Sequence, residues 1–131
     1  MYVKCVINDL SKLTDVPVAE RLKEGIHIDG PITDLVIGEI YPVQAIEVHL
    51  DRGLWLYLHT VEVNAYPYPY PTEFFQIIDS TIPRDWQVGH GSLNEVLRLS
   101  FATWANNDRY YELLVDGDKK AEEKYAESRT K

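Results

Sequence analysis

The sequence of 131 residues contains one cysteine, Cys5, which lies in the short apolar run 3–7. A single cysteine cannot form an intrachain disulfide, and a free cysteine in such a run is typically a small buried side chain. Scarce cysteine is usual in proteins of reducing compartments, so we expect a cytoplasmic protein.

Long apolar runs are also absent. No stretch approaches about 18 consecutive apolar residues, the length that a membrane helix needs. Residues 1–9 do not combine a basic region with an apolar one, as a secretion signal would. These absences predict a soluble chain that is not exported.

Positive charge is scarce. The chain carries 13 basic and 21 acidic residues, which gives a formal net charge of -8 at pH 7. The resulting field repels nucleic acids and anionic membrane surfaces and attracts cationic partners. We therefore expect neither a nucleic acid nor a membrane as a partner.

Catalytic and metal-binding motifs are absent as well. The sequence has no Gly-x-Ser-x-Gly elbow, phosphate loop, dinucleotide fingerprint or His-Glu-x-x-His pair. The segment Gly89-His90-Gly91-Ser92 is better explained as a connector than as an anion-binding turn. Because these motifs are missing, we expect no catalytic residue and no cofactor. The histidines also lack the spacing of a zinc site, so we expect no metal. These histidines are His27, His49, His59 and His90.

The chain fits one domain over 1–131, with a β-rich part at 1–86 and a mainly helical layer at 87–131. Asp15 and Gly25 are suited to begin and end a short helix. Strand composition and helical spacing mark the remaining elements. The expected strands cover 2–7, 40–50, 54–63 and 74–78, and the expected C-terminal helices cover 102–115 and 119–128.

Residues 93–101 have two interpretations. Ser92 and Glu95 form the pattern of a helix-capping box, and the apolar spacing that follows is compatible with a helix. Strict alternation of side chains over 96–101 is instead typical of a strand. We favour a strand at 96–100.

Segments 40–50 and 54–63 are expected to form a hairpin around Asp51-Arg52-Gly53, with Gly53 in the left-handed conformation. This loop pairs Leu50 with Leu54 and gives the hairpin one aliphatic face. The opposite face mixes aromatic and ionisable side chains, which suits an interface because Trp and Tyr often anchor interfaces and His titrates near neutrality. This first candidate surface consists of Glu47, His49, Trp55, Tyr57 and His59.

Two interpretations are open for this face. It forms a site for a partner, or the C-terminal helices cover it. Trp104 and Tyr111 are suitable covering residues, because helices packed on a sheet must bury their apolar side against it.

Tyrosine and proline alternate over residues 66–71. Each proline fixes φ and disfavours helix in the residue before it, so the backbone is expected to be extended and to lie outside any central strand. The stretch is either a recognition element or a structural crossing along the sheet. Its tyrosines, the second set of candidate partner-binding residues, are Tyr66, Tyr68 and Tyr70.

Three short segments stand out beside these patterns. They are Ile37-Gly38-Glu39-Ile40-Tyr41-Pro42-Val43, Trp55-Leu56-Tyr57-Leu58 and Pro71-Thr72-Glu73-Phe74-Phe75. Together they resemble small bacterial and phage proteins with an SH3-like barrel, which pair their strands in the order expected here and have a proline-rich crossing before the last strand. The resemblance implies an α+β fold, in which a small SH3-like antiparallel β-barrel carries a short N-terminal helix and has C-terminal helices packed on it.

Later segments are similar to a group of short uncharacterised proteins, some of which are grouped with immunity proteins of polymorphic toxin systems. This resemblance contains no catalytic signature, so it implies a fold more than a function. The segments are Ile82-Pro83-Arg84-Asp85-Trp86, Ser100-Phe101-Ala102-Thr103-Trp104 and the run from Tyr110 to Asp118.

From these observations we expect a non-enzymatic protein-binding module. Its most concrete form is an immunity or inhibitor protein that binds a basic toxin or a host enzyme through an acidic, aromatic-rich surface. The alternative is a small-molecule-binding protein or weak enzyme that uses His49 or His59 in a pocket beside the hairpin 40–63.

Overall fold

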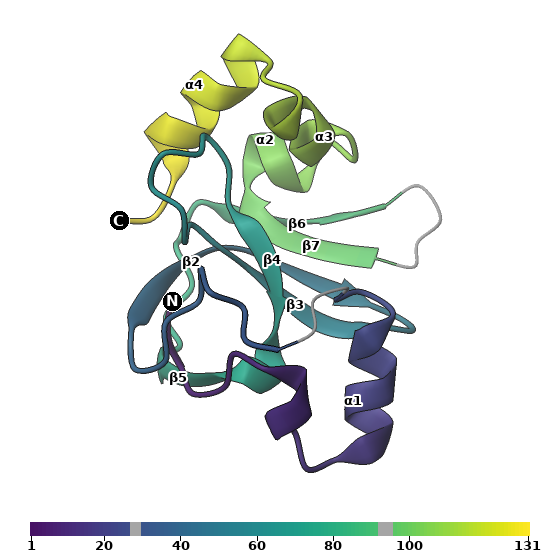
Figure 1. The fold of residues 1–131 in the computed structure, drawn as a ribbon. Coiled ribbons are helices and arrows are strands. Elements are labelled where there is room, and N and C mark those ends of the chain that lie inside the picture. The colour runs from purple at the N-terminus through teal and green to yellow at the C-terminus, as the bar shows by residue number, and fades with distance from the viewer. Residues whose placement is uncertain (27–29, 92–95) are drawn as a thin grey trace.

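The structure, a computed structural model, describes residues 1–26, 30–91 and 96–131. It is an α+β fold with a seven-stranded antiparallel sheet. Helices α2, α3 and α4 gather at one end of the molecule and α1 lies at the other (Figure 1). The strands are β1 (Tyr2–Cys5), β2 (Ile40–His49), β3 (Gly53–Leu58), β4 (Tyr68–Pro71), β5 (Phe75–Asp79), β6 (Trp86–His90) and β7 (Val96–Phe101). The α-helices are α1 (Val16–Lys23), α2 (Ala102–Ala105), α3 (Tyr110–Val115) and α4 (Lys119–Ser128), and the 3-10 helices are η1 (Leu10–Lys12) and η2 (Thr72–Phe74).

The sheet is organised around the long strand β2. Its strands follow the order β4-β3-β2-β1-β5, and a hairpin of β7 and β6 is added beside β2. The first residues of β2 pair with β1, whereas residues 46–49 pair with β7 along the same edge. The α+β class is therefore confirmed, but the sheet is open, so a closed SH3-like barrel is not confirmed.

The hairpin of β2 and β3 separates two hydrophobic cores. One core is largely aliphatic and packs Val43, Leu56 and Leu58 with Val3 and Phe74. The other is largely aromatic and lies between the hairpin and the C-terminal helices. Its buried members are Ala45, Tyr57, Phe101, Trp104, Tyr110, Leu114, Ala121 and Tyr125.

The hairpin register differs from the expected one by two residues. Val48 pairs with Leu54, and His49 pairs with Gly53, so the loop consists of residues 50–52. Gly53 adopts the left-handed conformation as expected, with φ of 83°, but it lies at the start of β3 rather than in the loop. A shift of two residues keeps the side chains of residues 45–49 and 54–58 on their expected faces. An irregularity between Val43 and Ala45 interrupts the alternation, and Val43 packs in the aliphatic core whereas Ala45 packs in the aromatic one. Leu50, expected to pair with Leu54, is instead 85% exposed at the tip.

The segment with alternating tyrosine and proline forms β4, an edge strand that pairs with β3. Proline lacks a backbone N–H, so an edge strand is a position that tolerates it.

Residues 96–101 form the favoured strand, and the helical interpretation of that stretch is wrong. The capping box of Ser92 and Glu95, like His27, lies outside the described residues. Strand β6 occupies residues 86–90, which we expected to form part of a connector.

The C-terminus is held against β2. The Gln44 side chain donates to the Thr130 carbonyl oxygen at 2.8 Å and accepts from the Thr130 N–H at 2.7 Å. The Tyr2 hydroxyl donates to the carbonyl oxygen of Lys131. These bonds anchor the chain that follows α4.

Within the described residues, no helix has the length and apolar character needed to cross a membrane.

Candidate functional site

The C-terminal helices cover much of the mixed aromatic and ionisable face of the hairpin. Tyr57 is 6% exposed, and its ring makes edge contacts with Trp104 and Tyr111, each at 5.0 Å between ring centroids. Covering by these two residues was one of the two interpretations of this face. Tyr57 is therefore part of the aromatic core, and the remaining candidate residues divide between the interior and the surface.

A buried ion pair lies beneath this face. The Glu47 carboxylate accepts from Arg98 Nε at 2.7 Å and from the Tyr57 hydroxyl at 2.8 Å. His49 Nε2 lies 3.3 Å from the same carboxylate. Burial, together with the nearby Glu47 carboxylate, raises the pKa of Tyr57 far above its usual value, so the phenol stays a hydrogen-bond donor. Arg98 was missed by sequence reasoning because its position beside Glu47 depends on the pairing of β7 with β2.

His59 is buried against α4. Its ring stacks on Tyr125 with 5.7 Å between centroids, and Nδ1 lies 2.9 Å from the Tyr125 hydroxyl. Burial, with a further contribution from the Arg129 charge, lowers the pKa of His59, so the ring is neutral at pH 7. A cavity of about 330 Å³ adjoins His59 and is bounded by α4. His49 lines a different cavity, so the described cavities do not bring the two histidines together.

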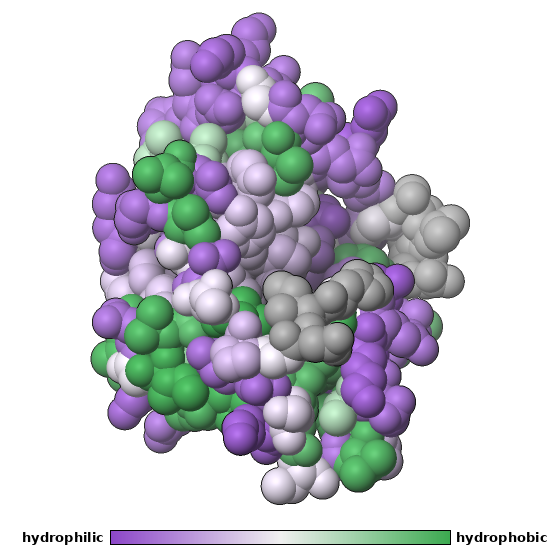
Figure 2. All heavy atoms as spheres, viewed as in Figure 1, coloured by the Kyte–Doolittle hydropathy of each residue, from purple (hydrophilic) through white to green (hydrophobic). Residues whose placement is uncertain are grey.

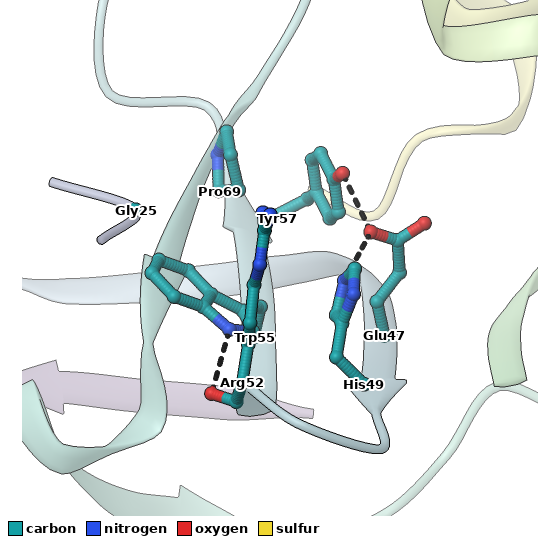
Figure 3. A pocket seen from close by; sticks show the side chains of 7 residues that line it. All are labelled: Gly25, Glu47, His49, Arg52, Trp55, Tyr57 and Pro69. Atoms are coloured by element: carbon teal, nitrogen blue, oxygen red, sulfur yellow. Dashed lines mark hydrogen bonds and ion pairs between the residues drawn. The ribbon is translucent and has the colours of Figure 1, made fainter. Parts of the chain in front are cut away.

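The cavity beside His49 is small, about 150 Å³, and Figure 3 shows it from close by. Trp55 forms one wall, and its indole N–H donates to the Arg52 carbonyl oxygen at 3.1 Å. Trp55 is only 7% exposed, because Gly25 at the end of α1 lies directly against its ring. A Cβ on Gly25 would lie 3.0 Å from the ring edge. The lining residues are Gly25, Glu47, His49, Arg52, Trp55, Tyr57 and Pro69.

A second cavity of about 250 Å³ adjoins the first, because both are lined by Gly25 and Pro69. We call it the tyrosine cavity. Among the described residues, Asp34 is the one charged side chain that lines it, and the aromatic walls come from Tyr68 and Tyr70 of β4. The described lining residues are Gly25, Ile26, Ile32, Asp34, Tyr68, Pro69 and Tyr70.

The three candidate tyrosines have different environments. Tyr70 is buried, its hydroxyl lies 2.7 Å from that of Thr60, and burial raises its pKa to about 12. Tyr68 is half-buried, and its hydroxyl accepts from the Asn64 amide. Tyr66 does not line the tyrosine cavity and instead contacts the rings of Tyr68 and Tyr111 edge-on. Asp34 and Ile32 were not among the candidates, because no pattern in the sequence indicates that residues 32–34 lie beside Tyr68 and Tyr70.

Metal binding receives no support from this geometry. Across residues 1–26, 30–91 and 96–131, no three His, Cys, Asp or Glu side chains are placed to hold a metal ion. The candidate site consists of the two adjoining cavities described above, one beside His49 and one beside Tyr68.

Comparisons with known proteins give no family assignment. No protein-family model, no curated protein and no solved structure matches this chain. The similarity to SH3-like barrel proteins and immunity proteins therefore stays an expectation from short segments. The function has to be inferred from the side chains and cavities of the chain itself.

Proposed function

We propose that the protein is a non-enzymatic protein-binding module that receives a basic side chain of its partner in the tyrosine cavity. The observation that carries this proposal is the composition of that cavity, which combines two tyrosine rings with Asp34 and has no cation among its described lining residues. An immunity or inhibitor protein acting on a basic toxin or host enzyme is the most concrete form of this function.

The chemistry of the cavity suits a lysine or arginine. A cation gains from the faces of aromatic rings, and an exposed carboxylate at the rim adds a charge-assisted hydrogen bond. Asp34 is exposed, whereas Tyr70 is buried and fixed by Thr60, so the carboxylate is reachable and the aromatic wall is rigid. The chain charge of -8 would speed the approach of a basic partner.

The size of the cavity favours a side chain over a free ligand. Pockets for drug-sized ligands usually enclose about 300–1,000 Å³. The tyrosine cavity has about 250 Å³ and the cavity beside His49 about 150 Å³. A single inserted side chain requires less space than a complete small molecule, so both cavities suit a protein partner.

The alternative function, a small-molecule site or weak enzyme that uses His49 or His59, has weaker support. The cavity beside His49 is about half of the usual minimum size. The cavity beside His59 is larger, about 330 Å³, but Nδ1 of that ring is engaged by the Tyr125 hydroxyl. His49 shares its cavity with Glu47, but its Nε2 lies 3.3 Å from that carboxylate, which also accepts from Arg98 and Tyr57. Neither histidine is therefore presented as a free base.

We also propose that the open sheet is related to an SH3-like barrel. Its support is the strand order β4-β3-β2-β1-β5, in which η2 connects the two edge strands directly after the proline-rich β4. Proteins with an SH3-like barrel can bind partners without a catalytic centre, but this relation alone assigns no partner.

Charge reversal at the rim of the tyrosine cavity tests the proposed function. Wild type, Asp34→Lys and Asp51→Lys would each be immobilised and exposed to the same lysate of the source organism, and retained proteins would be identified by mass spectrometry. Asp51 lies in the exposed hairpin loop, so its variant has the same net charge as Asp34→Lys. We expect a basic protein that wild type and Asp51→Lys retain and Asp34→Lys loses. Equal retention by all three chains would refute the proposal.

A further inference from the structure

We infer that a cavity between the turn preceding β6, the junction of β7 with α2, and α4 binds small molecules that carry a phosphate group. We call it the basic cavity. It encloses about 370 Å³, within the range of small-molecule pockets. The inference is independent of the proposed partner-binding site. Its lining residues are Arg84, Asp85, Trp86, Gln87, Phe101, Ala102, Thr103, Lys124 and Ser128.

The charge of this cavity is opposite to that of the chain. Arg84 and Lys124 provide two cations, and Asp85 provides one carboxylate. Within the described residues, neither cation has an ion-pair partner, and Arg21, Lys23, Arg98, Arg109 and Lys119 are the Lys and Arg residues that do. In a chain with a net charge of -8, two cations that line one cavity without an acidic partner favour an anionic ligand.

The other polar lining groups suit a phosphate. Thr103 and Ser128 supply hydroxyl groups that make no side-chain hydrogen bond to the described part of the chain. Gln87 accepts from the Asn106 amide through Oε1, which leaves its own N–H groups as donors. A guanidinium, an ammonium, hydroxyls and an amide together provide enough donors for the three terminal oxygens of a phosphate monoester.

Two aromatic residues line the cavity, of which Trp86 is partly exposed and Phe101 is buried. Trp86 pairs with Phe101 across the strands β6 and β7, and both residues line the cavity. An aromatic ring offers a stacking surface for a planar or apolar group attached to the phosphate. The ligand class that fits both features is a small phosphate monoester with a ring. A nucleic acid polymer fits less well, because the remaining surface of the chain is acidic and repels it. Figure 2 shows that hydrophilic residues gather over the C-terminal helices that border this region.

Intrinsic fluorescence provides a direct measurement. Of the three tryptophans, Trp55 and Trp104 are buried and Trp86 is partly exposed, so a ligand in the basic cavity acts mainly on Trp86. Phenyl phosphate, inorganic phosphate and phenol would be titrated into the full chain at low salt. We expect saturable binding of phenyl phosphate, weaker binding of inorganic phosphate, and no saturation with phenol. Absence of saturation with phenyl phosphate up to about 10 mM, a weak affinity limit, would overturn the inference.

Charge-removing variants separate a specific site from general attraction. Lys124→Ala and Arg84→Ala should each weaken phenyl phosphate binding by about tenfold, since each removes a charge-assisted contact. Lys120→Ala is the matched control, because Lys120 lies in the same helix, is exposed and does not line the cavity. Equal weakening by Lys120→Ala and Lys124→Ala would overturn the inference, because it would indicate attraction to overall charge. Lys124→Gln, with thermal unfolding of every variant, separates lost binding from lost folding.

Discussion

One face of the β2–β3 hairpin packs aliphatic side chains against β1 and η2, whereas the other face packs aromatic rings from the C-terminal helices around a buried ion pair. The aliphatic face depends on apolar area and shape, which tolerate substitutions of similar volume. The other face depends on directional bonds among Glu47, Arg98 and Tyr57, which tolerate little change.

The largest expected effect comes from breaking the ion pair. Arg98→Met leaves the Glu47 carboxylate buried without its cation, and removing one partner of a buried pair costs about 3–5 kcal/mol of the free energy of unfolding. Urea denaturation measures this loss. Combining Arg98→Met with Glu47→Leu and Tyr57→Phe should restore most of the stability, because apolar side chains of similar volume often replace a buried ion pair without loss and Tyr57→Phe removes the hydroxyl that Glu47 accepted from. An Arg98→Met single variant as stable as wild type would show that the pair is dispensable.

The aliphatic face should respond to volume. Leu58 is fully buried, so Leu58→Ala should lower the free energy of unfolding by about 2–5 kcal/mol through lost burial and an unfilled cavity. Leu58→Met, which conserves volume, should cost less than about 1.5 kcal/mol. Leu54→Ala is the matched control on the same strand, because Leu54 is 36% exposed and loses less contact. Equal losses for Leu54→Ala and Leu58→Ala would contradict the assignment of this core.

Local patterns in the sequence predict the faces of the hairpin and the starts of α1 and α4, but not the break that divides the expected helix 102–115 into α2 and α3. Alternation with period two places residues 45–49 and 54–58 on their correct faces even though the register differs by two residues. Asp15 and Asp118 accept from backbone N–H groups three residues later, as expected for N-terminal caps. These signals lie within a few residues of the structure that they determine.

Contacts between distant segments could not be predicted in the same way. Glu47 and Arg98 are 51 residues apart, and Gln44 and Thr130 are 86 residues apart, so neither pair has a local signature. The segment that begins at Gly89 was predicted to be a connector, but Gly89 lies in strand β6. A Cβ there would lie 1.6 Å from the Ala105 carbonyl oxygen, so glycine is required by the packing of α2 and not by a turn. The tyrosine cavity likewise depends on Asp34 meeting β4.

The smallest expected effect is a pH dependence that belongs only to the aromatic face. The pKa of His59 is lowered in the folded state, mainly by burial, so the unfolded chain binds a proton that the folded chain does not. This contribution to stability is present above the usual histidine pKa near 6.5 and is lost as the pH falls below it.

Denaturation of wild type and His59→Gln from about pH 7.5 to about pH 5 measures this term, because other titrating groups are shared by the two chains. Wild type should lose more stability than His59→Gln as the pH falls, so the difference between the two chains should shrink. His90→Gln removes an exposed histidine of β6 and serves as the matched control. Parallel stability curves for wild type and His59→Gln would show that His59 is hydrated in the folded chain, and the aromatic face would then be open to water beside α4.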